Sequence, residues 1–338
     1  MHIADQISLR HGQLTSSLGR TSARSGSFIL ERRQYSNDSK AEREDDIKDL
    51  TKLLASGSHA EGILDIVGYT DDTEAQCFNL VFAIPDHVSF KGSLHQMLCE
   101  TLRVPSLDMR VSLCVQLAES VLHVHRLDLV HKNISSANIA VMKSSPDDQG
   151  EKGYEALSVF LLNWNLVRRM SDATNRVGET SWWKGIYCHP KRQMELAEEE
   201  YSMGHDIYSL GVCMLEVLTW KSLVEYADGK RIISPMFRDR AANLGVLEEN
   251  RSRMRGRAQK TESELCTANA SAVQRVLLDL ARTELPTTAG SKLSRLVVSC
   301  LSCLEGGFPN LSFADKSKIE TGMNFMVSVK AALGQISI

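Results

Sequence analysis

The sequence lacks the features that mark several classes of protein. No apolar run approaches the ~18 to 20 residues that a membrane-spanning helix needs, and the N-terminus has no apolar segment of the signal-peptide type. Neither charge dominates, because 39 Lys and Arg stand against 42 Asp and Glu, for a formal net charge of −3. This balance disfavours nucleic acid or an anionic membrane as the main partner. We therefore expect a cytoplasmic or nuclear protein that is not secreted.

Cysteine is also sparse. Eight cysteines in 338 residues are too few for a disulfide scaffold and fit a reducing compartment. The only close pair is Cys300 and Cys303, and no second Cys or His pair stands nearby to complete a zinc site. Cys300 instead falls in an apolar stripe at helical spacing, with Leu293, Leu296, Val297, Leu301 and Leu304. We predict no metal centre.

Hydrophobic residues make up 43% of the chain, which is enough for a substantial core. Residues 28–35 are typical of a strand, 36–45 form a polar stretch, and Ile47, Leu50, Leu53 and Leu54 mark one side of a helix. Two strands near 63–70 and 77–84 follow, and the second ends at Pro85, which cannot donate to a strand ladder. The first 85 residues are therefore strand-rich.

After Pro85 the pattern becomes helical. Helices are predicted at 111–125, 207–218, 291–304 and 316–334, with a strand pair at 139–142 and 157–162, whereas 221–288 gives no clear signal. The sequence thus predicts an α+β protein with a small strand lobe at 25–85 and a larger helical lobe at 86–338. Residues 1–24 are expected to be a disordered or partial N-terminal lead-in. Residues 6–26 carry Arg10, Arg20 and Arg24 and no acid, which also allows an import peptide.

Several motifs occur in a fixed order along the larger lobe. Residues 129–138 read Leu-Val-His-Lys-Asn-Ile-Ser-Ser-Ala-Asn, directly after the long helix. This segment resembles the catalytic loop of protein kinases, His-Arg-Asp followed at a fixed spacing by Asn. Further matches are Asn163-Trp164-Asn165 for Asp-Phe-Gly, His189-Pro190-Lys191 for Ala-Pro-Glu, and Asp206 to Gly211 for the start of the central helix.

The resemblance implies a two-lobed protein-kinase-like fold over roughly residues 25–335. It places Arg33 at the ATP-binding lysine, with a slip to Arg32 left open, and Asp46 at the acidic partner of that lysine. It also implies structural roles for His131, which packs beside the loop, for Asp206, which holds the loop backbone, and for Gly211. Glu-Arg-Arg-Gln-Tyr and Tyr-Cys-His-Pro-Lys-Arg-Gln resemble most the kinase-like proteins of filamentous fungi.

Several residues that carry out phosphate transfer in the family are replaced in this sequence. Asn133 replaces the catalytic base, and Asn163 replaces the metal-binding Asp, while Asn138 keeps the family's metal-binding Asn. Ser135 stands where the family has a lysine. An amide has negligible basicity and is a weak ligand for Mg²⁺, which prefers carboxylate oxygen. Nor do the widely spaced Gly12, Gly19 and Gly26 form a phosphate-covering loop.

A second set of expectations concerns the end of the segment between Asn163 and Lys191. Lys191 replaces a Glu that the family pairs with an Arg near the last helices, and residues 303–309 contain no Arg. Both halves of that ion pair are therefore predicted to be lost.

We interpret the chain as a pseudokinase that acts as a protein-interaction or regulatory module. The alternative is an atypical ATP-binding Ser/Thr kinase with residual activity, and a false resemblance is the third interpretation. No cofactor is required on the first interpretation, ATP binding is left open, and Mg²⁺ binding is disfavoured.

Two segments suggest where partner proteins bind. Adjacent Trp182 and Trp183 cannot both face inward on an extended chain, so at least one is available to a partner. A basic segment carries Arg251, Arg253, Arg255 and Arg257; it is either a docking surface for an acidic partner or a solvated loop.

Overall fold

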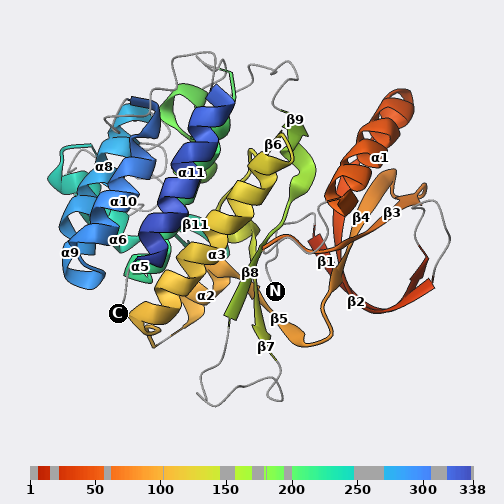
Figure 1. The fold of residues 1–338 in the computed structure, drawn as a ribbon, viewed down its shortest axis with the longest axis horizontal. Coiled ribbons are helices and arrows are strands. Elements are labelled where there is room, and N and C mark those ends of the chain that lie inside the picture. The colour runs from red at the N-terminus through yellow and green to blue at the C-terminus, as the bar shows by residue number, and fades with distance from the viewer. Residues whose placement is uncertain are drawn as a thin grey trace.

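An antiparallel sheet and one long helix form the N-terminal part of the chain (Figure 1). The computed structural model describes residues 7–15, 23–56, 62–101, 103–144, 157–169, 179, 181–193, 200–246, 270–305 and 318–335. The sheet has the order β1-β2-β4-β3. Its strands are β1 (Ile7–Thr15), β2 (Ala23–Gln34), β3 (Ile66–Asp72) and β4 (Cys77–Ile84). A short turn, η1 (Asn37–Ser39), leads into helix α1 (Lys40–Ser56), which packs on β3 and β4.

Two stretches of this part differ from the sequence-based expectation. Residues 7–15, expected within a disordered lead-in, form β1, which pairs with β2 from Ile7↔Glu31 to Thr15↔Ala23. The polar stretch at 36–45 is largely helical, because α1 already begins at Lys40. Ser36 and Ser39 form a capping box at the preceding turn, so polar residues here start a helix instead of a loop.

A three-stranded sheet lies between the N-terminal sheet and the helices (Figure 1). It has the order β5-β7-β8 and consists of β5 (Val88–Ser93), β7 (Ile139–Ser144) and β8 (Leu157–Leu161). The pairing of β7 with β8 confirms the predicted strand pair, whereas strand β5 was not predicted. Two short strands, β6 (Leu129–Val130) and β9 (Arg168–Arg169), pair beside this sheet.

Helices make up most of the remaining chain. They are α2 (Leu94–Glu100), α3 (Leu107–Arg126), α4 (Trp182–Gly185), α5 (Met203–Thr219), α6 (Pro235–Asn243), α8 (Ala270–Thr283), α9 (Leu285–Thr288), α10 (Ser291–Leu301) and α11 (Lys318–Gly334). Short 3-10 turns add η2 (Ser136–Asn138), η4 (Trp164–Leu166), η5 (Pro190–Arg192) and η6 (Cys303–Glu305). The unreadable stretch at 221–288 contributes α6, α8, α9 and the hairpin of β10 (Val224–Ala227) and β11 (Lys230–Ile233). The α+β architecture with a sheet-rich N-terminal lobe and a helical C-terminal lobe is therefore confirmed.

Helix α5 is the centre of the larger lobe. Every one of its residues is buried, which agrees with the absence of a polar face in the sequence. It packs against α3 and α10, and Gly211 allows the close approach of α10, because a Cβ there would lie 2.7 Å from Cys300 Cβ. Cys300 and Cys303 are both buried, in line with a core position.

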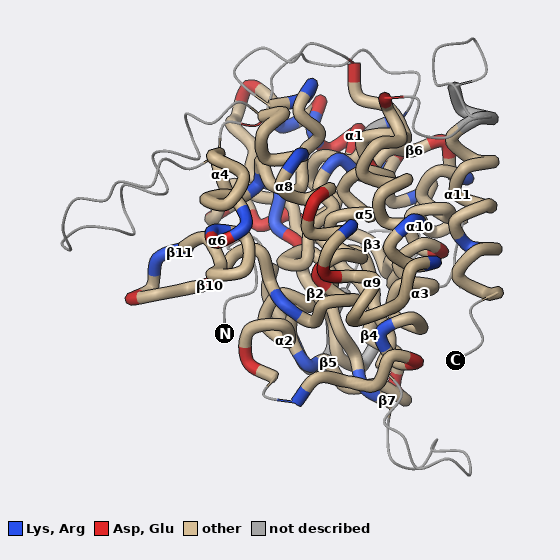
Figure 2. The backbone as a smooth tube through the Cα atoms, turned by 90° about the vertical axis from the view of Figure 1, so that its left-hand side faces the viewer, with Lys and Arg blue, Asp and Glu red and all other residues tan. Residues whose placement is uncertain are grey.

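Residues of both charges are spread along the described chain. In Figure 2, Lys and Arg alternate with Asp and Glu along the tube instead of gathering on one face. No helix in the described ranges is long and apolar enough to cross a membrane.

Candidate functional site

The loop between β6 and β7 is fixed by a carboxylate from helix α5. Asp206 is fully buried and accepts hydrogen bonds from the backbone N–H groups of His131 (2.8 Å) and Lys132 (3.0 Å). It also accepts from Tyr201 Oη (2.8 Å) and lies 3.2 Å from His125 Nε2. These are the contacts that the role expected for Asp206 requires.

The environment of Asp206 keeps it ionised. Burial of the carboxyl opposes its ionisation. The hydrogen bond and charge of His125, with the charge and the backbone N–H of His131, outweigh burial and lower the pKa of the carboxyl. Lys132 has a φ of 65°, so the loop turns sharply at the residue that Asp206 holds. The imidazole of His131 is fully buried, and burial lowers its pKa to about 4, although Asp206 opposes this shift. His131 is therefore neutral at pH 7.

Four asparagine side chains meet where the loop faces the segment after β8. Asn138 Nδ2 donates to the carbonyl oxygen (2.9 Å) and to Oδ1 (3.0 Å) of Asn133. Asn138 Oδ1 accepts from Asn163 Nδ2 (3.1 Å), and Asn163 Oδ1 accepts from Asn165 Nδ2 (2.7 Å). We call these four residues the amide cluster. It brings together the three predicted site residues 133, 138 and 163, and it carries no formal charge.

A buried group of aromatic rings lies next to the amide cluster. Asn163 has left-handed backbone angles (φ 65°, ψ 59°), a conformation in which Asn is enriched among non-glycine residues. Trp164 follows it and is fully buried. Its ring lies 4.9 Å from the ring of His131 and 6.4 Å from that of Phe82, and its Nε1 donates to Leu161 O (3.2 Å). Trp164 thus packs against Phe82 of strand β4 and against His131 of the loop between β6 and β7.

Strand β2 holds the same segment from the other side. Glu31 is fully buried and accepts from the backbone N–H groups of Asn163 (2.6 Å) and Trp164 (2.8 Å). Arg33 is also buried, and its guanidinium donates to the carbonyl oxygen of Trp164. Arg32 is exposed, so the slip from Arg33 to Arg32 that the sequence left open is wrong in this structure. The acid that approaches residue 163 is therefore Glu31.

Glu31 was missed by the motif comparison, although the strand pattern contained the signal. Residues 29, 31 and 33 share one face of β2, because side chains alternate along a strand, and all three are buried. Burial raises the pKa of Glu31 to about 7, although the two backbone donors and Arg33 favour the anion. Burial also lowers the pKa of Arg33 to about 10, opposed by Glu31, so Arg33 stays protonated. This face of β2 therefore presents an acid and a cation that are already bonded to the 163–164 backbone.

The residue expected to pair with Arg33 lies on helix α1. Asp46 has 60% of its side chain exposed and forms an ion pair with Arg43 at 4.0 Å, while its charge favours the protonated form of Arg33. Among the residues described here, no ion pair joins Asp46 to Arg33. Helix α1 turns Ile47 and Leu50 toward the sheet, and the role expected for Asp46 as the acidic partner of Arg33 stays a prediction.

The end of the segment before α5 is tied to the last helices by a different pair of residues. His189 is buried, and its Nε2 lies 3.6 Å from Glu305 Oε1, which makes an ion pair when the imidazole is protonated. Glu305 Oε1 also accepts from Gln274 Nε2 (2.6 Å). His189 and Glu305 thus connect the segment that ends near Lys191 with the turn after α10. The predicted loss of the family's Glu–Arg pair stays a prediction.

Trp182 and Trp183 lie in a helical turn, α4, and not on an extended chain. Both rings are partly buried against the core. The guanidinium carbon of Arg231 lies 4.0 Å from the ring centre of Trp183. The basic segment with Arg251, Arg253, Arg255 and Arg257 lies outside the described residues.

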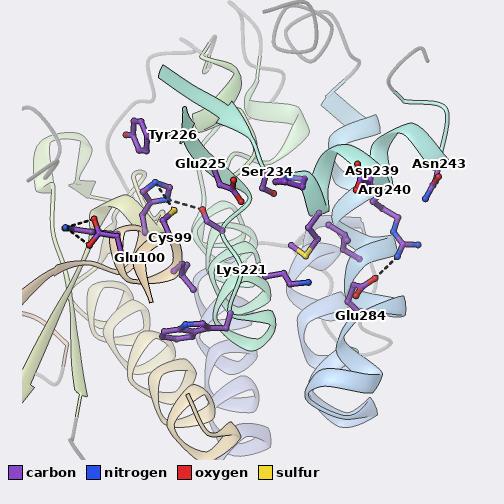
Figure 3. A pocket seen from close by; sticks show the side chains of 18 of the residues that line it. Cys99, Glu100, Lys221, Glu225, Tyr226, Ser234, Asp239, Arg240, Asn243 and Glu284 are labelled. Atoms are coloured by element: carbon purple, nitrogen blue, oxygen red, sulfur yellow. Dashed lines mark hydrogen bonds and ion pairs between the residues drawn. The ribbon is translucent and has the colours of Figure 1, made fainter. Parts of the chain in front are cut away.

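Two cavities adjoin this framework. One, of about 450 Å³, borders the loop and includes Lys132, Asn133, Ser135 and Arg192. Ser135 is buried, and its Oγ has no hydrogen-bond partner in the described ranges. The other, of about 1030 Å³, lies among α2, α6 and α8, away from the amide cluster (Figure 3).

The donor set of the amide cluster is a poor match for Mg²⁺ with ATP. Magnesium prefers anionic carboxylate oxygens, whereas residues 133, 138, 163 and 165 offer amide oxygens, of which those of 133, 138 and 163 already accept hydrogen bonds. The nearest acid, Glu31, is engaged with backbone N–H groups. Within the described ranges, no group of three or more His, Cys, Asp and Glu side chains is arranged to hold a metal ion.

Comparison with known proteins gives one family and several distant relatives. A family described as protein tyrosine and serine/threonine kinase matches residues 33–238. Eukaryotic translation initiation factor 2-alpha kinase 1 of Rattus norvegicus is 30% identical over 110 residues, or 30% of this chain and 16% of the relative. A probable serine/threonine-protein kinase of Dictyostelium discoideum is 25% identical over 138 residues, 41% of this chain and 7% of the relative.

A leucine-rich repeat receptor-like tyrosine-protein kinase of Arabidopsis thaliana is 24% identical over 145 residues, which cover 42% of this chain and 15% of the relative. The matched regions thus span at most 16% of the length of these three relatives.

Proposed function

Because the chain belongs to the protein tyrosine and serine/threonine kinase family, we propose that it is a pseudokinase, a kinase-like domain that acts by binding other proteins. The observation that carries this proposal is the amide cluster. Asn133 and Asn163 occupy the two positions at which phosphate transfer uses carboxylates, and their amides hydrogen-bond within the cluster.

The expected loss of rate is large. A positioned general base contributes about 10²- to 10⁴-fold, which corresponds to roughly 3 to 5 kcal/mol of activation free energy. Asn133 has no basic group to replace it. The loss at Asn163 acts on a separate step, the placement of Mg²⁺ and the phosphates, so the two effects combine. Phosphate transfer is thus lost or very weak in the function that we propose.

Glu31 supports the same proposal. Its carboxyl group lies 2.6 Å from the backbone nitrogen of Asn163, on the side of the cleft from which the family's lysine contacts the phosphates. Burial raises the pKa of Glu31 to about 7, so the side chain at that place carries no positive charge for phosphate. Arg33, also on β2, donates to Trp164 O. Weak nucleotide binding follows from these charges.

The second candidate is an atypical ATP-binding Ser/Thr kinase with residual activity. Two observations favour it. Asp206 holds the loop at His131 and Lys132, and Trp164 is packed beside His131, so the framework around the cluster is assembled. Asn138, the family's metal-binding Asn, is also present.

The proposal includes four finer expectations. The chain is similar to the kinase-like proteins of filamentous fungi, and it acts in the cytoplasm or nucleus. It contacts partner proteins through Trp182, Trp183 or the basic segment at 251–257, and it acts as a regulatory module or scaffold.

The deciding experiment is a set of thermal unfolding curves with ATP, with and without Mg²⁺. A ligand at a hundred times its Kd stabilises the folded state by about 2.7 kcal/mol, so binding is visible as a rise in Tm. We expect no rise for the parent protein and a Mg²⁺-dependent rise for the double variant Asn133→Asp, Asn163→Asp. Asn133→Asp alone leaves Asn163 in place and should not respond.

Transfer of radiolabelled phosphate to the protein or to a generic substrate is measured on the same samples. Incorporation by the parent at ordinary kinase rates, abolished by Asn138→Ala, would establish the second candidate instead. Equal ATP binding by all three proteins would mean that residue 163 does not face the phosphates.

A further inference from the structure

Two side chains of metal-binding types lie together in the cavity of about 1030 Å³. His95 and Cys99 both line this cavity and are four residues apart on α2, so they share one face of the helix. Cys99 Sγ lies 3.8 Å from His95 Nε2. The cavity shares no lining residue with the amide cluster, and Cys99 is exposed, so a small ion can reach the pair from solvent.

Ser222 orients the ring of His95. The Oγ of Ser222 lies 2.6 Å from Val224 O and donates its one hydrogen to that carbonyl oxygen. The lone pairs of Oγ are left to accept, and His95 Nδ1 lies 3.1 Å away. The proton of the neutral ring is therefore on Nδ1, and Nε2 presents its lone pair to Cys99. A metal-binding histidine is usually held in this way, by a hydrogen bond from its other ring nitrogen.

The distance between the two atoms fits a shared metal ion. Tetrahedral zinc bonds sulfur at about 2.3 Å and nitrogen at about 2.0 to 2.1 Å, so two such ligands lie about 3.6 Å from each other. The 3.8 Å between Cys99 Sγ and His95 Nε2 is close to this value. A thiol is only a weak hydrogen-bond donor, so the contact of the two side chains is weak without an ion. Zinc enzymes also present two ligands from positions i and i+4 of one helix.

Carboxyl groups surround the thiol. Burial raises the pKa of Cys99 to about 11, with smaller contributions from Glu225, Glu216 and Glu100. These acids disfavour a thiolate that has no counterion, and they attract a cation for the same electrostatic reason. A bound divalent ion reverses the balance at the sulfur, because a coordinated thiol loses its proton. The surroundings therefore favour a thiol without a metal ion and a thiolate with one.

Two arginines near this end of the cavity oppose a cation. Burial and, to a smaller extent, the charge of Arg231 lower the pKa of His95 to about 4, so the ring is neutral at pH 7, which is the form that binds a metal. The guanidinium carbon of Arg231 lies 4.0 Å from the ring centre of Trp183. Arg238 forms an ion pair with Asp239 at 3.7 Å. Both guanidinium groups thus have partners of their own within the described residues.

Glu225 is placed to supply a third ligand. It lines the same cavity, is partly exposed, and has neither a hydrogen bond nor an ion pair in the described ranges. Figure 3 shows Glu225 at the same end of the cavity as Cys99. Glu100, in contrast, accepts from Gln96 Nε2 (3.1 and 3.2 Å). Two ligands are thus in place and the third requires rotation of Glu225, which agrees with the absence of a preassembled group of three among the described side chains.

We propose that Cys99 and His95 bind a zinc ion, with Glu225 and a water molecule in the two remaining positions. Zinc usually has four ligands. Formation of the bond to Cys99 releases the thiol proton to solvent, whereas His95 binds through the lone pair of Nε2 and releases none. The bound ion joins α2 to the β10–β11 hairpin across one end of the cavity. This inference goes beyond the proposed function, because neither ATP nor the amide cluster takes part.

The test is titration of the reduced, metal-free chain with zinc chloride in competition with a chromophoric chelator. We expect one ion to bind per chain. The same titration with cobalt(II), which takes the place of zinc, gives a sulfur-to-metal charge-transfer absorption when a thiolate is a ligand. Cys99→Ser should remove this absorption and weaken zinc binding at least tenfold. His95→Asn, which keeps a polar group near Ser222 but removes Nε2, should also weaken zinc binding at least tenfold.

Matched variants separate the ligands from their neighbours. Glu225→Gln should weaken zinc binding about tenfold, whereas Glu100→Gln should leave the affinity unchanged. Cys188→Ser removes a thiol that lines the other cavity and should change neither the cobalt absorption nor the affinity. Hydrogen exchange in the β10–β11 hairpin should slow when zinc is added to the parent chain. Melting curves recorded without metal show whether each variant is folded.

Four results would overturn the proposal. They are cobalt–thiolate absorption that persists in Cys99→Ser, equal zinc affinity of the parent chain and His95→Asn, an equal loss in Cys188→Ser, and binding too weak to compete with the chelator, which would mean an adventitious ion only. If Cys99→Ser or His95→Asn fails to fold, the comparison of Glu225→Gln with Glu100→Gln decides, and equal affinities of these two would also overturn it. All samples are free of ATP, so the nucleotide and phosphate-transfer experiments fail or succeed separately.

Discussion

Replacing Asp206 by alanine tests how the loop is held. The carboxylate accepts four hydrogen bonds, two of them from the backbone N–H groups of His131 and Lys132, and all of it is buried. Alanine offers no acceptor to these donors. The change therefore leaves at least two buried donors without partners.

The magnitude follows from the number of orphaned groups. A buried donor without a partner costs about 1 to 3 kcal/mol, so the two backbone N–H groups alone predict a loss of about 4 kcal/mol in the free energy of unfolding. Tyr201 and His125 also lose a hydrogen-bond partner, so the total loss in the free energy of unfolding is expected to be at least this large. Because the pKa of Asp206 is lowered in the folded state, the carboxylate is ionised at pH 7 and the full effect is present there.

Urea denaturation followed by circular dichroism measures the change. We expect Asp206→Ala to lose about 4 kcal/mol and Asp206→Asn, which keeps one oxygen acceptor, to lose less. The control is Asp49→Ala, since Asp49 is 69% exposed and forms an ion pair with Lys52 on the same helix. A loss below ~0.5 kcal/mol is expected there. If Asp206→Ala unfolds at the same urea concentration as the control, the carboxylate does not hold the loop.

Two further predictions concern buried groups. The folded-state pKa of Glu31 is raised from 4.5 to about 7, so the folded protein holds this proton more tightly than the unfolded chain does, and its stabilising contribution is lost as pH rises from about 4.5 to 7. Glu31→Gln should therefore reduce the fall in unfolding free energy between pH 5 and pH 8 by about 2 kcal/mol, and an unchanged fall would contradict this origin. Gly211→Ala should lose about 1 to 3 kcal/mol, because its Cβ would lie 2.7 Å from Cys300 Cβ. Gly334→Ala, with open space around the new Cβ, is the matched helical control and should be neutral or slightly stabilising; equal Tm changes in the two variants would refute the packing argument.

The sequence by itself established the family and the main helices. The motifs from residue 131 to residue 211 lie on local stretches whose order and spacing can be read along the chain. Helices α3, α5, α10 and α11 have an apolar periodicity that is a local property, and each occurs close to its predicted range. The replacement of two acids by Asn133 and Asn163 is equally visible without a structure.

The tertiary structure decided which charges meet the amide cluster. Glu31 contacts a residue 132 positions away in the sequence, and no pattern on β2 alone says which of its buried side chains reaches that residue. The same holds for His189 and Glu305, and for the cavity of about 1030 Å³, whose lining residues lie between residues 95 and 284 of the sequence. Periodicity shows which side of an element is buried, because burial repeats with the backbone geometry. The identity of the partner depends on how distant elements pack, and only their packing placed an acid, instead of the expected cation, beside residue 163.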